Sequence, residues 1–409
     1  MKLIQPIEED IKQPEFRSAR EINAMKLIKV GVDASRVKSG GGVEHLLGIL
    51  DIADPAEFGI GEIHVWAYKK LLDALPKKDW LIKHHPKALE RSLLHQSWWQ
   101  AVSLSKELEA AGCHLLFSAE ASTFCRFKPM IVLNQNMLAY EDGVLALFGL
   151  GRDRIQQTLM YFVQRQAFRF ATASIFLTQY AAEQVQRRVG KLRKTTCIPH
   201  GVAEIFKTTS PQTAWPNEFE RAVRCLYVSP VLEYKHQSEV VRAVKALRDQ
   251  GLNIELTLTG GGGRRALKIL NGLLEQVDPN RCFVKVMRFI PNHDVARLVA
   301  DADIFVFASS CETFGIALLE AMTIGVPIAC SNRSSLPETL RDAGEYFDPQ
   351  DPKSIARAIY KLVKNPTHRI EIAMRARVLA ANYSWSRSAR ETWTFVAEVY
   401  RETSVRLNA

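Results

Sequence analysis

The 409-residue chain contains no long hydrophobic run. Its longest apolar stretches, Val144–Gly149 and Ile304–Ala308, fall far short of the roughly 18 residues that a membrane-spanning helix needs. The first segment, Met1–Ala24, is polar and lacks the apolar core of a secretory signal. We therefore expect no transmembrane span and a protein that stays in the cytoplasm.

Paired cysteines are also missing. The cysteines are odd in number and scattered, and no C-x-x-C pair occurs among them. This pattern argues against the framework of a disulfide-rich domain and against a zinc site. We expect reduced, mostly buried thiols and no metal centre. The seven cysteines are Cys113, Cys125, Cys197, Cys225, Cys282, Cys311 and Cys330.

Charge of one sign is in modest excess. The chain has 54 Lys and Arg against 44 Asp and Glu, a formal net charge of +10, and an isoelectric point near 9.2. Such a balance is compatible with nucleic acid, an anionic membrane surface or anionic small substrates. Because no helix-turn-helix, zinc or RNA-binding aromatic signature is present, we expect no nucleic-acid partner.

What the sequence does contain is a regular alternation of short apolar runs with segments of helical period. This pattern predicts parallel strands joined by crossover helices, in two α/β halves that face a central cleft. The predicted strands are Ile28–Val32, Ile63–Trp66, Leu115–Ser118, Met130–Leu133, Ser174–Leu177, Thr196–Ile198, Val223–Val228, Ile254–Thr259, Cys282–Val286, Ile304–Phe307, Val326–Cys330 and Glu345–Phe347.

Composition shifts suggest where the chain divides. Prolines and a Ser/Thr cluster interrupt the alternation after Lys207, which is typical of a connection between domains. We predict a flexible extension at 1–24, a first Rossmann-like domain at 25–207, a linker at 208–220, a second Rossmann-like domain at 221–383 and a final helix at 384–409.

Two glycine-rich turns follow predicted strands. Gly40, Gly41 and Gly42 precede an apolar helix, so they form either a phosphate-binding turn or a plain tight turn. The spacing lacks G-x-G-x-x-G, which argues against a dinucleotide site. In the second half, Gly260–Gly263 precedes Arg264 and Arg265, whose guanidinium groups either bind phosphate or remain solvated.

The pair Asp301 and Asp303 could hold a metal-bound nucleotide, but it lies between a predicted helix and the strand Ile304–Phe307. Short polar residues are common at such junctions. We interpret the pair as structural.

The most informative stretch is Ser309–Met322, which follows a predicted strand. Glycine and alanine-rich residues here open a helix, whose first free N–H groups, those of Phe314, Gly315 and Ile316, form a seat for an anion. Glu312 and Glu320 flank this seat, eight positions or about 12 Å apart along a helix. That span suits a nucleotide sugar, although Glu320 could also be an ordinary helix acid.

These residues resemble the E-x7-E signature of the retaining group 1 glycosyltransferases of the GT-B fold. The resemblance extends over most of the chain and includes the glycine turn Gly40–Gly42, the segment Ile198–Val202, Tyr227–Lys235, Ser334–Glu338, Gly344–Pro349 and Tyr383–Ser386. It implies two Rossmann-like domains and a final helix that crosses back to the first domain.

The resemblance also implies a set of site residues. Lys235 would contact the donor diphosphate, Glu312 would face the sugar near the reacting carbon, and Glu320 would hold the ribose. The expected donor site consists of Glu320, Thr313, Phe314, Gly315, Ile316, Gly41, Gly42 and Arg264, with Lys235 and Glu312 as catalytic residues. We expect a nucleoside-diphosphate sugar as donor substrate, no cofactor and no metal.

Two departures from the family pattern stand out. Ser229-Pro230 occupies a place where many relatives carry Gly-Arg, and Arg264 or Arg265 is a candidate replacement. The segment Leu133–Met137, where many relatives have an active-site histidine, contains none. No catalytic residue of the first domain is therefore assigned. Residues near Arg288–Pro291 are expected to select the base.

The acceptor is expected in the first domain, as a glycan or a lipid-linked sugar. Residues 68–99 are rich in lysines, histidines and tryptophans, so this basic face is either a peripheral contact with an anionic membrane or a solvated surface. The alternative to an enzyme is a catalytically weak or inactive partner subunit with this fold. Intact Lys235, Glu312 and Glu320 favour the enzyme.

Overall fold

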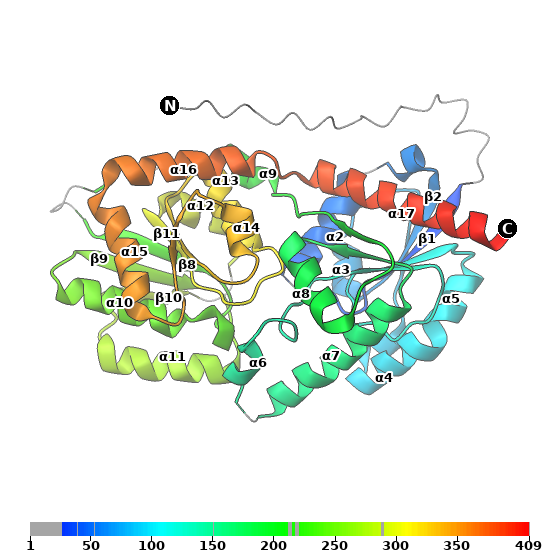
Figure 1. The fold of residues 1–409 in the computed structure, drawn as a ribbon, viewed down its shortest axis with the longest axis horizontal. Helices are drawn as coiled ribbons and strands as arrows, with labels where there is room; N and C mark the ends of the chain where they lie inside the picture. The colour runs from blue at the N-terminus through cyan, green and yellow to red at the C-terminus, as the bar shows by residue number, and fades with distance from the viewer. Residues whose placement is uncertain are drawn as a thin grey trace.

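The computed structural model describes residues 27–38, 40–52, 54–149, 151–211, 215–216, 221–287 and 290–408. The predicted extension at 1–24 lies outside them, as do 212–214 and 217–220 of the predicted linker and Arg288 and Phe289 of the predicted base-binding segment. The described residues form two parallel sheets with their own helices, lying side by side (Figure 1).

The first sheet has seven parallel strands in the order β3-β2-β1-β4-β5-β6-β7. All residues of β4, β5 and β6 are buried, which explains why these strands read as continuous apolar runs. The strands are β1 (Ile28–Asp33), β2 (Ile60–Trp66), β3 (Leu81–His84), β4 (Leu115–Ser118), β5 (Met130–Leu133), β6 (Ala173–Phe176) and β7 (Thr195–Cys197).

The second sheet has six parallel strands in the order β10-β9-β8-β11-β12-β13. In both sheets the strand order reverses beside the first strand, between β1 and β4 and between β8 and β11, and such switch points are where α/β sheets bind ligands. The strands are β8 (Val223–Val228), β9 (Ile254–Thr259), β10 (Val284–Met287), β11 (Ile304–Phe307), β12 (Ile328–Ser331) and β13 (Glu345–Phe347).

Each predicted strand is present with shifted ends at most, and one strand was missed. The missed strand is β3, Leu81–His84, at the edge of the first sheet, where only Leu81 is fully buried. Because an edge strand with a lysine and a histidine carries no apolar run, the sequence pattern does not reveal it.

Helices surround both sheets. Within the described ranges, none is both long and apolar enough to span a membrane. The helices of the first half are α2 (Gly41–Ile52), α3 (Lys69–Ala74), α4 (Leu93–Trp98), α5 (Leu104–Ala110), α6 (Val144–Leu147), α7 (Arg152–Phe170), α8 (Gln179–Val189) and α9 (Glu204–Thr208). Those that follow are α10 (Gln237–Asp249), α11 (Arg264–Val277), α12 (Asn292–Asp301), α13 (Ile316–Ile324), α14 (Leu336–Leu340), α15 (Pro352–Lys364), α16 (Pro366–Ala380) and α17 (Trp385–Asn408).

The last helix, α17, lies along the first half of the molecule (Figure 1). It packs on α2, and the buried Trp393 donates its Nε1–H to the carbonyl of Ile49 at 3.0 Å. Lys194 and Glu402 form an ion pair with 2.5 Å between Nζ and Oε1. The chain therefore passes to the second sheet and then returns to the first.

Two glycines allow the close approach at which α17 begins. A Cβ on Gly48 would lie 2.2 Å from the indole of Trp385, and a Cβ on Gly201 would lie 2.1 Å from the backbone nitrogen of Trp385. A larger residue fits at Gly48 only if the indole of Trp385 moves, and at Gly201 only if the backbone moves. These contacts join the end of the first half to the start of the returning helix.

Asp303 joins β11 to the start of β8. Its buried carboxylate accepts hydrogen bonds from Arg221 Nη2 at 2.7 Å and from the backbone N–H of Arg224 at 2.8 Å. The described residues include no cluster of three or more His, Cys, Asp or Glu placed to hold a metal. Asp303 therefore serves the packing of the second sheet.

Candidate active site

A cavity of about 450 Å³ lies between the two halves and is lined by residues of both. The first half contributes the glycine turn before α2, and the second contributes η4 (Glu233–Lys235), a short 3₁₀ helix, together with the loop before α13. Most of the predicted donor and catalytic residues line this one cavity: Gly41, Gly42, Lys235, Glu312, Thr313, Phe314, Gly315 and Ile316.

Lys235 and Glu312 form an ion pair inside the cavity. The lysine is buried, and its backbone carbonyl accepts a hydrogen bond from the hydroxyl of Tyr227 at 2.7 Å. Its ammonium group also lies 5.2 Å from the ring centroid of Tyr234 and 5.5 Å from that of Phe307. These contacts hold a cation at one place in the cavity, where a phosphate could exchange with the glutamate.

The loop that carries Glu312 is held by Ser334 and Ser335, which come directly before α14. The N–H of Glu312 donates to Ser334 Oγ at 2.9 Å, and Ser335 Oγ donates to the carbonyl of Glu312 at 3.0 Å. Gly315 then adopts φ 91°, a left-handed conformation that favours glycine, and α13 begins at Ile316. The N-terminal N–H groups of this nine-residue helix thus lie at the cavity wall, where they can bind an anion.

Glu320 lies further along the same helix, α13, and is not among the residues that line the 450 Å³ cavity. Burial, and to a lesser extent the negative charge of Glu44 on α2, raise the pKa of its carboxyl group to about 8. The glutamate therefore holds a proton at neutral pH in the structure described here.

Neither arginine of the second glycine turn lines the cavity. Arg264 is exposed at the start of α11. The guanidinium group of Arg265 lies against the first half, where a Cβ on Gly149 would approach its Nη1 to 3.3 Å. Ser229 and Pro230, which replace the Gly-Arg pair of many relatives, do line the cavity.

The first half supplies polar side chains that the sequence patterns did not reveal. Arg36, Glu120, Gln135 and Asn136 line the cavity, and Glu120 Oε1 accepts a hydrogen bond from Ser122 Oγ at 2.7 Å. Burial is the main cause that raises the pKa of the Glu120 carboxyl group. The sequence signal that could have pointed to Glu120 is its position just after the carboxyl end of a predicted strand.

His200 also lines the cavity and is paired with His45 of α2. Their Nδ1 atoms lie 3.2 Å apart, and both side chains are buried. Burial lowers the pKa of His45 to about 4, while burial and the neighbouring His45 lower the pKa of His200. Both rings are therefore neutral at physiological pH, and His200 lies edge-on to Phe314 with 5.4 Å between ring centroids.

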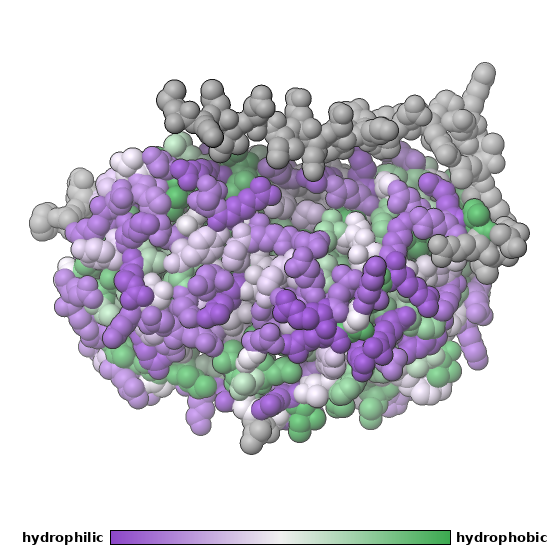
Figure 2. Space-filling model, in the orientation of Figure 1, coloured by the Kyte–Doolittle hydropathy of each residue, from purple (hydrophilic) through white to green (hydrophobic). Residues whose placement is uncertain are grey.

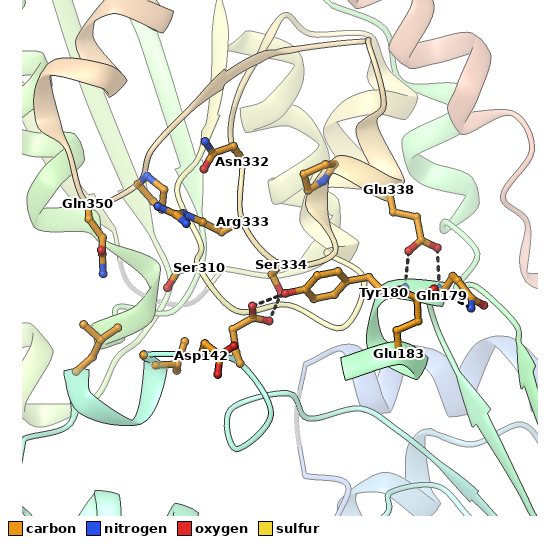
Figure 3. Close-up of a pocket in the computed structure, with 16 residues that line it drawn as sticks. Asp142, Gln179, Tyr180, Glu183, Ser310, Asn332, Arg333, Ser334, Glu338 and Gln350 are labelled. Atoms are coloured by element: carbon orange, nitrogen blue, oxygen red, sulfur yellow. Dashed lines mark hydrogen bonds between the residues drawn. The ribbon is translucent and has the colours of Figure 1, made fainter. Parts of the chain in front are cut away.

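A second cavity, of about 940 Å³, lies between the same halves, and none of the predicted site residues lines it (Figure 3). Hydrogen bonds cross it. The carboxylate of Glu338 accepts the N–H groups of Gln179 and Tyr180 at 2.8 Å each, at the start of α8. Ser334 Oγ donates to Glu141 Oε2 at 2.9 Å, and Glu141 also accepts the hydroxyl of Tyr180.

Part of the basic face at 68–99 contacts the rest of the first half, while Lys70, Lys77, Lys78 and Lys87 are exposed. Lys69 pairs with Asp73, and Lys83 donates to the carbonyls of Leu72 and Leu75 at 2.8 and 2.7 Å. The helix α4 instead exposes apolar side chains, with Leu94 82% and Trp98 63% exposed. Figure 2 shows hydrophobic side chains along the lower edge of the molecule, where Figure 1 places α4 and α7.

Comparison with known structures identifies the fold. The chain is similar to sucrose-phosphate synthase from Thermosynechococcus elongatus, with a TM-score of 0.71, 16% identity and coverage of 93% of this chain and 100% of that one. It is also similar to Anabaena HepE in complex with UDP and glucose, with a TM-score of 0.68, 16% identity and coverage of 90% and 99%. The two-sheet architecture is thus the GT-B fold of glycosyltransferases.

Sequence comparison adds the family of the second half. Residues 213–379 match the family Glycosyl transferases group 1. O-antigen chain mannosyltransferase B of Escherichia coli is 36% identical over 110 residues, 27% of this chain and 29% of that protein. The GDP-mannose-dependent alpha-(1-6)-phosphatidylinositol dimannoside mannosyltransferase of Mycobacterium tuberculosis (strain ATCC 25177 / H37Ra) is 33% identical over 158 residues, 38% and 39% of the two chains.

These alignments span less than half the length of the curated relatives. They fall on a chain whose whole described fold matches glycosyltransferase structures. The second half therefore matches the group 1 glycosyltransferase model, in a chain whose described fold is the GT-B fold.

Proposed function

We propose that this protein is a retaining glycosyltransferase that moves a sugar from a nucleoside-diphosphate sugar to an acceptor hydroxyl, in glycan, polysaccharide or glycolipid synthesis. The observation that carries the proposal is the buried Lys235, paired with Glu312 in a cavity at the N-terminus of α13. The group 1 match over residues 213–379 and the HepE complex with UDP support a nucleotide-sugar donor.

The chemistry needs stabilisation of the leaving diphosphate, whose negative charge grows as the glycosidic C–O bond breaks. Lys235 and the first N–H groups of α13 supply positive charge at one place, so the proposal requires no metal. When a phosphate binds Lys235, Glu312 loses its partner and accepts hydrogen bonds from sugar hydroxyls instead. Retention places the new bond on the face that the diphosphate leaves.

The remaining predicted residues take supporting roles. Thr313 to Ile316 would meet the phosphates and the sugar, and Gly41 and Gly42 would let the backbone approach the donor. Glu320 would bind the ribose, which requires the donor to reach beyond the 450 Å³ cavity to its half-buried place on α13. A role for Arg264 requires its exposed side chain to turn toward the donor.

The test is a thermal-shift screen of the purified protein with UDP-, GDP-, ADP- and dTDP-sugars, because a ligand that binds only the folded state raises the melting temperature. We expect one class of donor to stabilise the wild type and not Lys235→Ala, and that donor to be turned over. Stabilisation without any turnover would instead favour the inactive partner subunit, which Pro230 in place of the usual arginine also favours. No stabilisation by any donor would contradict both.

A further inference from the structure

The cavity has one carboxyl group on each wall. Among the described residues that line it, the two carboxylic acids are Glu312 of the second half and Glu120 of the first. Glu120 comes two residues after β4, which pairs with β1 at the switch point of the first sheet. The same strand β1 leads to the glycine turn at Gly41 and Gly42, so the first-half wall is built at the ligand-binding edge of its sheet.

The turn that carries Glu120 is held by side-chain hydrogen bonds. Ser118 Oγ donates to the carbonyl of Glu120 at 2.8 Å, and Gln135 Nε2 donates to the carbonyl of Ala119 at 2.8 Å. Ser122 Oγ binds Oε1 of the carboxyl group at 2.7 Å. Because these bonds fix the backbone and one carboxyl oxygen, Oε2 remains for a ligand in the cavity.

A negative charge at this place works against the donor. Glu120 shares the cavity with Lys235 and the N-terminus of α13, the groups that would bind a diphosphate. Burial and the nearby Asp33 raise the pKa of its carboxyl group, and Ser122 and Arg36 lower it. Burial of a carboxyl group costs free energy, and here the group also weakens anion binding. We therefore expect it to bind the uncharged acceptor hydroxyl and not the donor diphosphate.

We propose that Glu120 is the catalytic carboxyl group of the first half, and that its Oε2 binds the attacking hydroxyl of the acceptor. This inference rests on the proposed glycosyltransferase function. The hydroxyl oxygen forms a bond to the anomeric carbon while the bond from that carbon to the diphosphate breaks. The electron pair stays on the leaving phosphate, and the hydroxyl proton passes from its hydrogen bond with Oε2 to a phosphate oxygen as the new bond forms. Glu120 holds the hydroxyl so that its lone pair points at the carbon.

The experiment separates binding of the donor from use of the acceptor. Wild type, Glu120→Ala, Glu120→Gln and the control Glu109→Ala are compared, since Glu109 is exposed on α5 and is absent from the cavity. The donor found in the thermal-shift screen is titrated for its Kd, and transfer to a panel of octyl glycosides is followed by mass spectrometry.

We expect Glu120→Ala to lose transfer by about 100-fold with a donor Kd equal to or tighter than that of wild type, because the acceptor is misplaced while a group that opposes the diphosphate is removed. Glu120→Gln keeps an amide oxygen that accepts a hydrogen bond, so it should retain more activity than alanine. Wild-type transfer by Glu120→Ala, or loss of donor binding together with transfer, would overturn the assignment. A wild type without any donor binding would instead overturn the proposed function itself.

Discussion

Lys235 and Glu312 form an ion pair in which both side chains have little exposure to solvent. Removal of the lysine leaves a carboxylate without its partner and takes away the cation proposed for the diphosphate. We expect Lys235→Ala to lower sugar-nucleotide turnover by about 100-fold or more while the protein stays folded. Turnover by coupled nucleotide release and a far-UV melting curve measure the two effects.

The matched control for this change is Lys245→Ala, because Lys245 pairs with Asp249 on the exposed surface of α10. This control should keep wild-type turnover, since exposed ion pairs contribute little. Equal activity of Lys235→Ala and Lys245→Ala would show that Lys235 has no role in turnover of the donor.

Glu320 makes the stability of the protein depend on pH. Its pKa is about 8 in the folded protein, because of burial and then Glu44, against about 4.5 for an ordinary glutamate. Between these pH values the unfolded chain loses a proton that the folded protein keeps. The free energy of unfolding therefore falls as pH rises from about 4.5 to about 8, and this contribution is constant above that range.

We compare the free energy of unfolding of Glu320→Gln with that of wild type at pH 4 and at pH 9. From the lower to the higher pH, we expect this difference to shift in favour of Glu320→Gln by about 1–3 kcal/mol. Urea unfolding at the two pH values measures it. The expected sign is specific, because a carboxyl group with a lowered pKa would give the opposite change. A pH-independent difference between the two proteins would contradict the proposed protonation of Glu320.

At the scale of elements, the start of α17 depends on a glycine in the first half. A Cβ on Gly201 would lie 2.1 Å from the backbone nitrogen of Trp385, and the next nearest atoms, in Ser384 and Trp385, also belong to the backbone. We expect Gly201→Ala to destabilise the protein by about 3 kcal/mol or more, since rigid backbone must move. Gly272→Ala on α11 is the control, because nothing lies within 4 Å of its Cβ position.

Urea or thermal unfolding of the two alanine variants tests this packing. Gly272→Ala should be neutral or stabilising by up to about 1 kcal/mol, because alanine favours a helix. Similar stability of the two variants would mean that the backbone at the contact between Gly201 and α17 can move at little cost in free energy.

The strands show which elements sequence can reveal. Strands such as β4, β5 and β11 are fully buried, so their apolar runs stand out between helices. The edge strand β3 has polar residues and was missed. The loop at Glu312 to Ile316 was found because its residues are contiguous and follow a strand, and the cavity they line was expected between the halves.

The rest of the site could not be predicted from local pattern. Glu120 and the pair of His45 and His200 come from turns and a helix far apart in the sequence, and they meet only when the sheets are assembled. Arg264 had a plausible position after a glycine turn, but the turn leaves its side chain exposed. Single residues in turns carry no periodic signal.

At the scale of the whole molecule, the proposed acceptor side presents an apolar surface. Leu93, Leu94 and Trp98 of α4 are exposed at 55%, 82% and 63%, within the segment proposed to contact an anionic membrane. We expect Leu94→Glu/Trp98→Glu to lower co-sedimentation with phosphatidylglycerol vesicles at low salt by about tenfold, because apolar burial is lost and negative charge is added.

The control for this change is Ile370→Glu/Met374→Glu on α16 of the second half, where both side chains are also exposed. These substitutions should leave vesicle binding unchanged. If the wild type does not bind the vesicles at all, the proposed membrane contact is wrong. The proposed transfer would then take place between water-soluble substrates.

The contact between Gly201 and Trp385 has a mechanical consequence. The chain leaves the first half beyond Gly201, where α9 already packs on α12 and α13, and it returns at Trp385. Both connections between the halves thus pass close to one point, the contact of Gly201 with Trp385. Two further hydrogen bonds join the halves, one between Glu338 and Gln179 and one between Ser334 and Glu141. Any separation of the two halves would have to break these hydrogen bonds, whereas the contact of Gly201 with Trp385 could stay in place.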